Sequence, residues 1–521
     1  MAHEILVKDG TRQHRNARWP SDPPEKRAIP VSQDSTSNRP PLTLRTNLLY
    51  GVGTVAFGVH QAMLTSVLML FFNQVVGLPA AWVGAAIMVT LIFDAICDPL
   101  IGEWSDHTRS RWGRRHPFMY ASAVPAAAAF YFLFDPPLGW SKSSLLIYMA
   151  VMLVTVRVLL SLYEIPSSAL GPELTFDYDQ RTSLVSSRFF FGTLGGAAIS
   201  VLALQVFLRK DAAHPLGLLN RAGYSETALA AGIAIFLSIM ISCLGTHRFI
   251  ASVIHEPRVR GTWREKLGEV AGTVTNRSFL ALTIAGIVAA ISTGLRQGLD
   301  FYISAYFWDF TPVQMSYLAI VGLFAAFAGV ALAPAISSRF GKKRAMIVVF
   351  FASLLSGITP ITMRLLGIAP ANHTGALLAL VIGFSFVSST LSLSGFIIAS
   401  SMMADVVEDV AVATGQRSEG LLYAAVGLIA KCVTGAGTFL AGLILTWVSF
   451  PPHAVQGKVD PAVLHNLGMA FVPIATTFSA IAIAVLMLYE IDRSTHQSNV
   501  ARLAGAVDPG SQAAAKVSLT G

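Results

Sequence analysis

Charged side chains and cysteines are both scarce in this sequence. Only 13% of its 521 residues are Asp, Glu, Lys or Arg, whereas an ordinary soluble domain has about 25%. The three cysteines, Cys97, Cys243 and Cys432, stand in apolar stretches and lack the spacing of a disulfide framework or a metal site. The low charge excludes a water-soluble protein, and the cysteines are expected to be small packed residues.

Long apolar runs fill most of the chain instead. Hydrophobic residues make up 54% of it, and an apolar run of about 18 residues or more can cross a hydrocarbon core of about 30 Å. The sequence therefore predicts an all-α membrane protein. Twelve transmembrane helices are expected, at residues 47–76, 81–105, 117–135, 143–171, 186–208, 226–246, 279–307, 313–336, 344–366, 373–404, 418–448 and 466–490.

A basic connector separates the first six expected spans from the last six. It carries Arg258, Arg260 and Arg264, and no other expected connector is as long. The first residues of the chain are rich in Arg, Pro and Ser and have no apolar periodicity, which is typical of a disordered tail. The expected organisation is a disordered tail at 1–46, a six-helix bundle at 47–246, a cytoplasmic connector at 247–278, a second six-helix bundle at 279–493 and a disordered tail at 494–521.

Lysines and arginines concentrate on one side of this topology. They occupy both tails, the central connector and the turns at Arg109–Arg115 and Arg339–Arg344. Because cytoplasmic loops of membrane proteins are enriched in Lys and Arg, we expect a multi-pass protein of the plasma (cytoplasmic) membrane with both termini in the cytoplasm. The same placement explains the net charge of +8 without nucleic-acid binding.

Two short motifs echo one another in the two halves. Ser-Arg-Trp-Gly-Arg-Arg (Ser110–Arg115) lies between spans two and three, and Ser-Arg-Phe-Gly-Lys-Lys (Ser338–Lys343) lies between spans eight and nine. A glycine followed by two cations is also explained by a simple orientation signal. Its repetition at equivalent places favours a duplicated transporter fold, with two six-helix bundles around a central site.

Ionisable residues inside spans cost about 2.5–3.5 kcal/mol each on insertion scales, so each one indicates a function or a partner. Asp94 and Asp98 are four residues apart and therefore share one helix face. Two carboxylates on one face repel each other unless a cation or a proton neutralises them. They predict a cation site, and the alternative is that they pair with an arginine or cap a neighbouring helix.

The fourth and fifth spans carry further charges. Arg157 and Glu164 lie seven residues apart and precede Pro166, which predicts an unwound segment beside Glu164. Arg157 either neutralises one of the acids or has a functional role. Arg188, at the start of the fifth span, is either a snorkelling head group or a solute contact.

Charges also occur in the seventh and eleventh spans. Arg296 and Asp300, again four residues apart, are expected to form an internal ion pair with a structural role. Lys431 has no acid within one helical turn and is placed near the middle of the membrane. It is expected to pair with an acid of the N-terminal half, namely Asp94, Asp98 or Glu164.

These residues lie in segments that resemble a known family. Asp-Ala-Ile-Cys-Asp-Pro-Leu-Ile-Gly (Asp94–Gly102) and the segment Asp106–Pro117 resemble the signature of the glycoside-pentoside-hexuronide:cation symporters, a branch of the major facilitator superfamily. The resemblance extends over nearly all of the chain except the tails, through Tyr163–Pro166, Leu170–Thr175, Asp179–Thr182, Met403–Asp405, Gly415–Gly420 and Lys431.

The resemblance implies a role for several residues. It assigns cation binding to Asp94, Asp98, Ser161 and Cys97, where Cys97 replaces the amide of sodium-using relatives. Solute binding falls to Glu164, Arg188, Lys431 and Ser168, where Ser168 replaces a tryptophan, and a first-helix Lys-Asp pair of galactoside carriers is replaced by Ala56 and Phe57. Conformational gating falls to Asp106, Arg114 and Arg115.

The expected function is a cation-coupled secondary symporter for a sugar, glycoside or uronide that works by alternating access. A proton is favoured over sodium because Cys97 offers sulfur where sodium prefers oxygen. The expected partners are a small-molecule solute, the coupling cation and the lipid bilayer, for a monomer with no cofactor, no resident metal and no nucleic acid. The alternatives are a lysophospholipid or other amphiphile symporter of the same branch and a non-transporting membrane sensor. The sequence has no nucleophile–base pair at membrane depth, so an enzyme is not expected.

Overall fold

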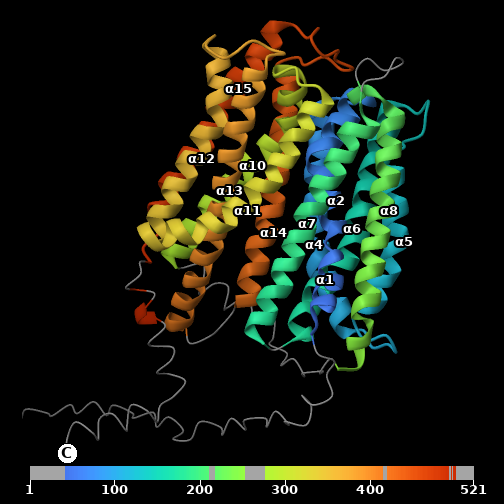
Figure 1. Cartoon of the computed structure of the whole chain (residues 1–521), viewed down its shortest axis with the longest axis vertical. Coiled ribbons are helices and arrows are strands. Elements are labelled where there is room, and N and C mark those ends of the chain that lie inside the picture. Colours follow the sequence, from blue (N-terminus) through green and yellow to red (C-terminus); the bar gives the residue numbers. More distant parts are fainter. Residues whose placement is uncertain are drawn as a thin grey trace, which may run out of the picture. The chain divides into compact units, whose positions relative to one another are not determined.

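The computed structural model describes residues 42–175, 177–209, 217–252, 276–414 and 419–491, together with residues 495 and 497–499. Helices form all the regular secondary structure of this part of the chain (Figure 1). The expected all-α architecture is therefore confirmed. The expected tails at 1–46 and 494–521 and the connector at 247–278 lie largely outside the described residues.

The N-terminal half begins with an interrupted helix and continues with five more. The first is built from α1 (Leu44–Val52), α2 (Val55–Ala62) and α3 (Leu68–Leu70), with π-helical turns η2 (Met63–Val67) and η3 (Phe71–Val75). The others are α4 (Ala80–His107), α5 (His116–Leu133), α6 (Lys142–Leu174), α7 (Tyr178–Leu202) with the turn η4 (Ala203–Phe207), and α8 (Arg221–Thr246). Short 3-10 turns, η5 (Gly217–Leu219) and η6 (His247–Ser252), flank α8.

The C-terminal half repeats this series. It consists of α10 (Arg277–Tyr302) with the π-helical turn η7 (Ile303–Phe307), α11 (Pro312–Phe340), α12 (Lys342–Leu365), α13 (Gly375–Thr414), α14 (Glu419–Trp447) and α15 (Pro461–Leu486).

Eleven helices of the described residues are long and apolar enough to cross a membrane. The helix at the third expected place, α5, is not among them. It has 18 residues and contains Pro117 and Pro125, and at 1.5 Å per residue it is about 27 Å long. Its buried side, with Met119, Ala126 and Phe130 fully covered, packs against α6 and α8. The twelve expected spans thus correspond to these eleven helices and α5.

Helix packing in the two halves follows one pattern. The first helix of each half contacts the fifth and sixth, as α2 does with α7 and α8, and as α10 does with α14 and α15. The second contacts the fourth (α4 with α6, α11 with α13), and the third contacts the fourth and sixth. The halves meet mainly where α4 packs on α14 and α7 packs on α11. This repeated arrangement is what a duplicated six-helix unit produces.

Some helices extend beyond their expected spans at their polar ends. α7 begins at Tyr178, eight residues before the expected start, because Asp177 caps it by accepting a hydrogen bond of 2.8 Å from the Gln180 backbone N–H. α13 continues to Thr414, beyond the apolar run. Hydropathy detects the part of a helix that lies in hydrocarbon and misses polar turns that extend past it.

The unwinding expected at Pro166 is wrong. α6 runs without interruption from Lys142 to Leu174 through both Pro166 and Pro172. A proline removes one backbone hydrogen bond, and neighbouring helices in a membrane protein hold such a helix together.

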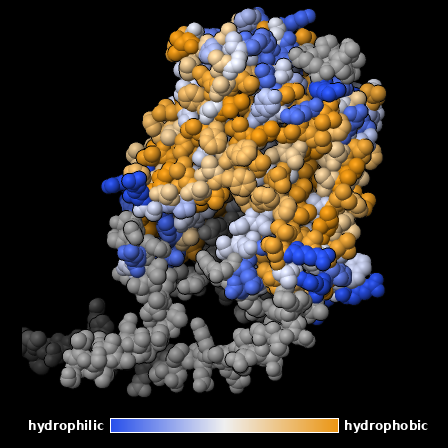
Figure 2. Space-filling view, in the orientation of Figure 1, coloured by the Kyte–Doolittle hydropathy of each residue, from blue (hydrophilic) through white to orange (hydrophobic). Residues whose placement is uncertain are grey.

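Apolar side chains cover the middle of the helices on the outer surface, and hydrophilic ones gather towards the helix ends (Figure 2). Large apolar residues such as Val151 and Leu229 are exposed. A surface of this kind is suited to contact with lipid.

Candidate functional site

The charged side chains of α4 and α14 meet where the two halves touch. The Lys431 ammonium lies 3.0 Å from Asp94 Oδ2 and also donates to Asp98 Oδ2. Asp94 and Asp98 are one turn apart on α4, and their side chains are only 6% and 18% exposed, whereas Lys431 is 41% exposed. The predicted pairing of Lys431 with an acid of the N-terminal half is confirmed.

Two residues of α6 complete this cluster, which we call the acid–lysine site (Asp94, Asp98, Arg157, Ser161 and Lys431). Ser161 Oγ lies 2.7 Å from Asp98 Oδ1 and 3.2 Å from Asp94 Oδ1, so its hydroxyl donates to either carboxylate. Arg157 Nη1 lies 3.7 Å from Asp94 Oδ2, which agrees with the interpretation that Arg157 neutralises an acid. Two anions thus face two cations in a largely buried place.

Close helix packing brings α14 near enough to α4 for these contacts. A side-chain carbon added to Gly442 would lie 2.5 Å from the Ala80 carbonyl oxygen, and one added to Gly84 would lie 3.0 Å from Phe439 Cα. Only glycine allows the backbones to approach so closely at these positions. The glycines therefore set the distance over which Lys431 reaches the acids.

Cys97 lies between the two acids on α4 and is half-buried. No hydrogen bond joins it to the acid–lysine site in the described part of the chain. Its expected position beside the two acids agrees with the structure, while cation binding there and its influence on cation choice stay predictions.

The expected solute-binding residues of the N-terminal half are not gathered into one contact group. Arg188 Nη1 donates to Ser167 Oγ over 2.9 Å, and its guanidinium lies 5.3 Å from the centre of the Tyr50 ring. Ser168 is exposed and donates to the Ile165 carbonyl. Glu164 is half-buried and forms no ion pair with another described residue. Their roles in solute binding stay predictions.

The expected gating residues form an ion-pair cluster at the start of α5. Arg115 lies 3.2 Å from Asp106 and 2.6 Å from Glu173, and Arg114 also pairs with Glu173. Glu173 was missed as their partner, although it stands in one of the family-like segments. An acid at the end of the fourth span, on the same side as the arginines, was the signal that could have identified it.

The echo motif of the C-terminal half makes the equivalent contact. Lys342 Nζ lies 2.7 and 2.8 Å from the two carboxylate oxygens of Asp405, near the end of α13. The glycines of both motifs, Gly113 and Gly341, have positive φ angles of 73° and 77°, which glycine adopts without strain. Both motifs therefore anchor a tight turn to the fourth helix of their own half. We call the end of the molecule that carries these two motifs the basic end.

Hydrogen bonds join the two halves at the opposite end. Tyr302 Oη donates to Asn73 Oδ1 over 2.8 Å. Gln74 accepts from the Ala454 N–H at 2.8 Å and donates to the Pro451 carbonyl at 3.2 Å. These contacts hold the halves together at the end distant from the basic motifs.

The internal pair expected between Arg296 and Asp300 is wrong. Both side chains are exposed on α10, and no ion pair joins them within the described residues. Spacing brings two residues to one helix face, but the rotamers of long side chains decide whether they meet. The two charges attract one another through space without forming an ion-pair contact.

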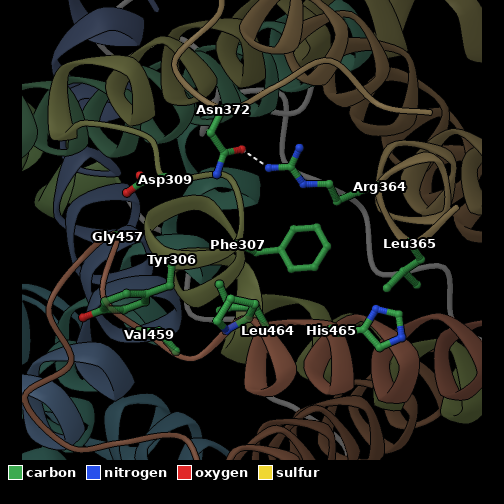
Figure 3. A pocket seen from close by; sticks show the side chains of 11 residues that line it. Tyr306, Phe307, Asp309, Arg364, Leu365, Asn372, Gly457, Val459, Leu464 and His465 are labelled. Atoms are coloured by element: carbon green, nitrogen blue, oxygen red, sulfur yellow. Dashed lines mark hydrogen bonds between the residues drawn. The ribbon is translucent and has the colours of Figure 1, made fainter. Parts of the chain in front are cut away.

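A cavity of about 380 Å³ lies at the opposite end, within the C-terminal half (Figure 3). Arg364 points towards Asn372 and donates to its side chain, and Asp309 pairs with His373 Nε2 at 2.9 Å. None of the predicted site residues lines this cavity, so it is not the candidate site.

Comparison with known proteins identifies the family. Residues 49–493 match the model of a family described as MFS/sugar transport protein. The chain is 26% identical to the "Uncharacterized symporter sll1374" of Synechocystis, covering 87% of this chain and 95% of that protein. It is 24% identical to the isoprimeverose transporter of Lactiplantibacillus pentosus, covering 89% and 93%, and 22% identical to the glucuronide carrier protein homolog of Escherichia coli, covering 86% and 93%.

Solved structures agree in fold. The D-xylose–proton symporter matches with a TM-score of 0.56 at 15% identity, covering 85% of this chain and 96% of that chain. The nucleoside transporter NupG matches with a TM-score of 0.55 at 15% identity, covering 85% and 99%. The chain has the major facilitator fold.

The protein is a multi-pass membrane transporter and not an enzyme. It belongs to the MFS/sugar transport family, in the glycoside-pentoside-hexuronide:cation symporter branch of the major facilitator superfamily. Its partners are accordingly a small-molecule solute and a cation.

Proposed function

We propose that this protein couples proton influx to the uptake of a sugar, glycoside or uronide by alternating access. The observation that carries the proposal is the acid–lysine site, where Lys431 of one half neutralises Asp94 and Asp98 of the other. The relatives include an isoprimeverose transporter and a putative glycoside/cation symporter, and their names support the solute class.

Lys431 acts as a tethered substitute for the coupling cation. With Lys431 in place, two positive and two negative side chains balance. When α14 moves away from α4, the acids keep only Arg157 as a partner and carry one uncompensated negative charge. One monovalent cation restores neutrality, and neutrality lowers the cost of exposing this site alternately to either side of a membrane.

The surroundings of the acids favour a proton over sodium. Arg157 lies beside Asp94 and leaves Asp98 as the carboxylate that needs a new partner. Sodium requires several oxygen ligands, whereas Cys97 offers sulfur at the adjacent position. A proton needs only one carboxylate oxygen, and Asp98 lies in hydrogen-bond contact with Ser161.

Uptake into sealed vesicles tests this function. We expect accumulation of at least one of isoprimeverose, xylose, glucosides or glucuronides under an imposed proton gradient, with little stimulation by sodium at fixed pH. Cys97→Asn restores an amide oxygen and should shift the preference towards sodium. Sodium stimulation of the unmodified protein without a response to a proton gradient would refute proton coupling. Uptake of lysophosphatidylcholine alone would assign the protein to amphiphile transport.

We further propose that the basic end faces the cytoplasm, as the charge of its turns favours. Lys142, at the start of α6, lies at the opposite end, and Arg111 lies in the basic motif between α4 and α5; both are exposed. A cysteine placed at Lys142 should react with an impermeant thiol reagent added outside intact cells, and one placed at Arg111 should react only after the membrane is opened. The parent protein, whose cysteines lie inside helices, is the control. Labelling of the Arg111 position from outside would reverse the orientation.

A further inference from the structure

His60 lies in the first helix of the N-terminal half, beside the acid–lysine site. It belongs to α2, and the residue is only 8% exposed. Charges of three other helices act on its ring, namely Arg157 of α6, Asp94 of α4 and Lys431 of α14. Since these are three of the five members of the acid–lysine site, a further ionisable group lies within electrostatic range of the proposed coupling site.

Two contacts fix the orientation of the His60 ring. Its Nδ1 lies 3.3 Å from the carbonyl oxygen of Ala56, four residues earlier in the same helix. A carbonyl oxygen can only accept, so Nδ1 carries the hydrogen in this contact, and the lone pair of the neutral ring is then on Nε2. The Phe57 ring packs edge-to-face on the imidazole at a centroid distance of 5.3 Å. The ring therefore presents a proton-accepting nitrogen in a fixed direction.

Nε2 is the free end of this ring. It forms no hydrogen bond with a described residue, and it is not among the unpaired polar atoms that the described chain encloses completely. Nearly all polar atoms that are cut off from water have a hydrogen-bond partner, because an unpaired one is costly. The position of Nε2 is accordingly explained if it borders space that water can enter.

We propose that His60 relays the coupling proton between the aspartates of the acid–lysine site and the water on the open side of the carrier. During release, the proton leaves the carboxyl group of Asp98, crosses a bridging water and joins the lone pair of His60 Nε2. The carboxyl group becomes a carboxylate and the imidazole becomes an imidazolium, and Nε2 then gives a proton to water. Uptake of a proton on the other side uses the same atoms in the reverse order. This role rests on the proposed proton symport.

The charges around His60 suit a relay better than a storage site for the proton. Arg157 and Lys431 repel a positive charge on the ring, while Asp94 attracts it. When Lys431 returns to the acids after Asp98 has lost its proton, it raises the electrostatic energy of a neighbouring imidazolium. Passing the proton on to water relieves this repulsion. Closure of the acid–lysine site thus clears the proton from His60 and opposes its return.

The helices packed on α2 place few other ionisable groups along the first helix: Tyr163 and Glu164 of α6, Arg188 of α7 and Cys243 of α8. Tyr163 and Cys243 are at most 2% exposed, so neither exchanges protons readily with water. Arg188 donates to Ser167 at 2.9 Å, and an arginine does not release its proton in a protein. Glu164 is therefore the competing candidate for a relay, and chemical rescue distinguishes it from His60.

Imidazole rescue of the full-length protein in proteoliposomes tests the relay. The initial rate of net downhill uptake is measured for isoprimeverose or, if the unmodified protein does not take it up, for the first of xylose, 4-nitrophenyl β-glucoside and 4-nitrophenyl β-glucuronide that it does. His60→Ala removes the ring and leaves room for free imidazole. We expect its net uptake to fall at least about fivefold, because every turnover must release a proton. Added imidazole should restore about half of the lost rate or more, whereas the bulkier buffer MOPS should not.

Solute exchange is the control for folding. Exchange needs no net release of protons, so His60→Ala should exchange solute nearly as fast as the unmodified protein. His60→Gln, which keeps a donor for the Ala56 carbonyl but cannot titrate, should show the same fall in net uptake with normal exchange, and it decides the question if His60→Ala does not fold. The matched control is His465→Ala, which removes an exposed histidine of α15 and should neither lose net uptake nor respond to imidazole.

Net uptake by His60→Ala at the unmodified rate, or a loss that imidazole does not restore, would overturn the relay. Loss of solute exchange in both His60 variants would assign the histidine a structural role and overturn it as well. If proton-driven uptake by the unmodified protein holds while the His60 variants behave normally, only the relay fails. If the unmodified protein responds to sodium and not to protons, proton coupling fails together with the relay. The two failures are therefore distinguishable.

Discussion

Lys431→Ala is expected to slow proton-driven uptake of solute at least about fivefold while the protein remains folded and inserted. In the unmodified protein Lys431 neutralises Asp94 and Asp98 after the proton has left. Without it, the empty carrier must reorient with an uncompensated carboxylate. Removing one partner of a buried ion pair costs about 3–5 kcal/mol, and because Lys431 is 41% exposed we expect about 1–3 kcal/mol here, or a slowing of at least about fivefold.

Solute exchange separates this effect from a folding defect. Exchange between solute inside and outside needs only the proton-loaded carrier, so Lys431→Ala should still exchange solute, and its exchange should still depend on pH. The matched control is Lys458→Ala, which removes an exposed lysine of the same half outside the site and should accumulate solute normally. An unchanged initial rate of proton-driven uptake by Lys431→Ala would show that the lysine has only a structural role.

Sequence alone could predict the acid–lysine site because acids are so rare in the spans. Asp94 and Asp98 share a helix face by their spacing, and Lys431 has no acid near it in the sequence, so its partner had to come from another helix. Because acids are rare in the spans, only a few residues were candidates for the partner of Lys431. Buried charge in a membrane is a strong constraint, and it determines partners across 333 residues of chain.

The same spacing rule failed at Arg296 and Asp300. These residues have the i, i+4 separation of Asp94 and Asp98, but which group each side chain contacts depends on the space around it. That space is created by α12, α13 and α15, which pack loosely enough around α10 to leave a cavity. Such packing results from many side chains of distant helices, and no local pattern records it.

The turns could also be predicted from the sequence, whereas their acidic partners could not. The echo motifs predicted two equivalent turns, and Gly113 and Gly341 share one backbone conformation. The acid that binds each motif, Glu173 or Asp405, lies about 60 residues further along the chain. A partner at such a distance is visible only when the helix ends are known to lie on one side of the membrane.

Asp98→Asn is expected to remove the dependence of transport on the proton gradient altogether. An asparagine imitates the protonated acid in shape and in lacking charge, but it cannot release a proton. One pH unit across the membrane supplies about 1.4 kcal/mol per proton and so about tenfold accumulation at one proton per solute. In the variant the proton gradient should produce no accumulation, so that the solute concentrations inside and outside the vesicles become equal.

Exchange measured as a function of pH distinguishes Asp98→Asn from Lys431→Ala. The asparagine variant has lost the carboxylate that takes up the proton, so its solute exchange should be independent of pH, whereas exchange by the lysine variant should not be. Asp135→Asn, which changes an acid bonded to Ser225 over 3.0 Å outside the acid–lysine site, is the matched control and should accumulate solute as the unmodified protein does. Proton-driven accumulation by Asp98→Asn would exclude Asp98 as the proton carrier and leave Asp94, beside Arg157, as the group to test.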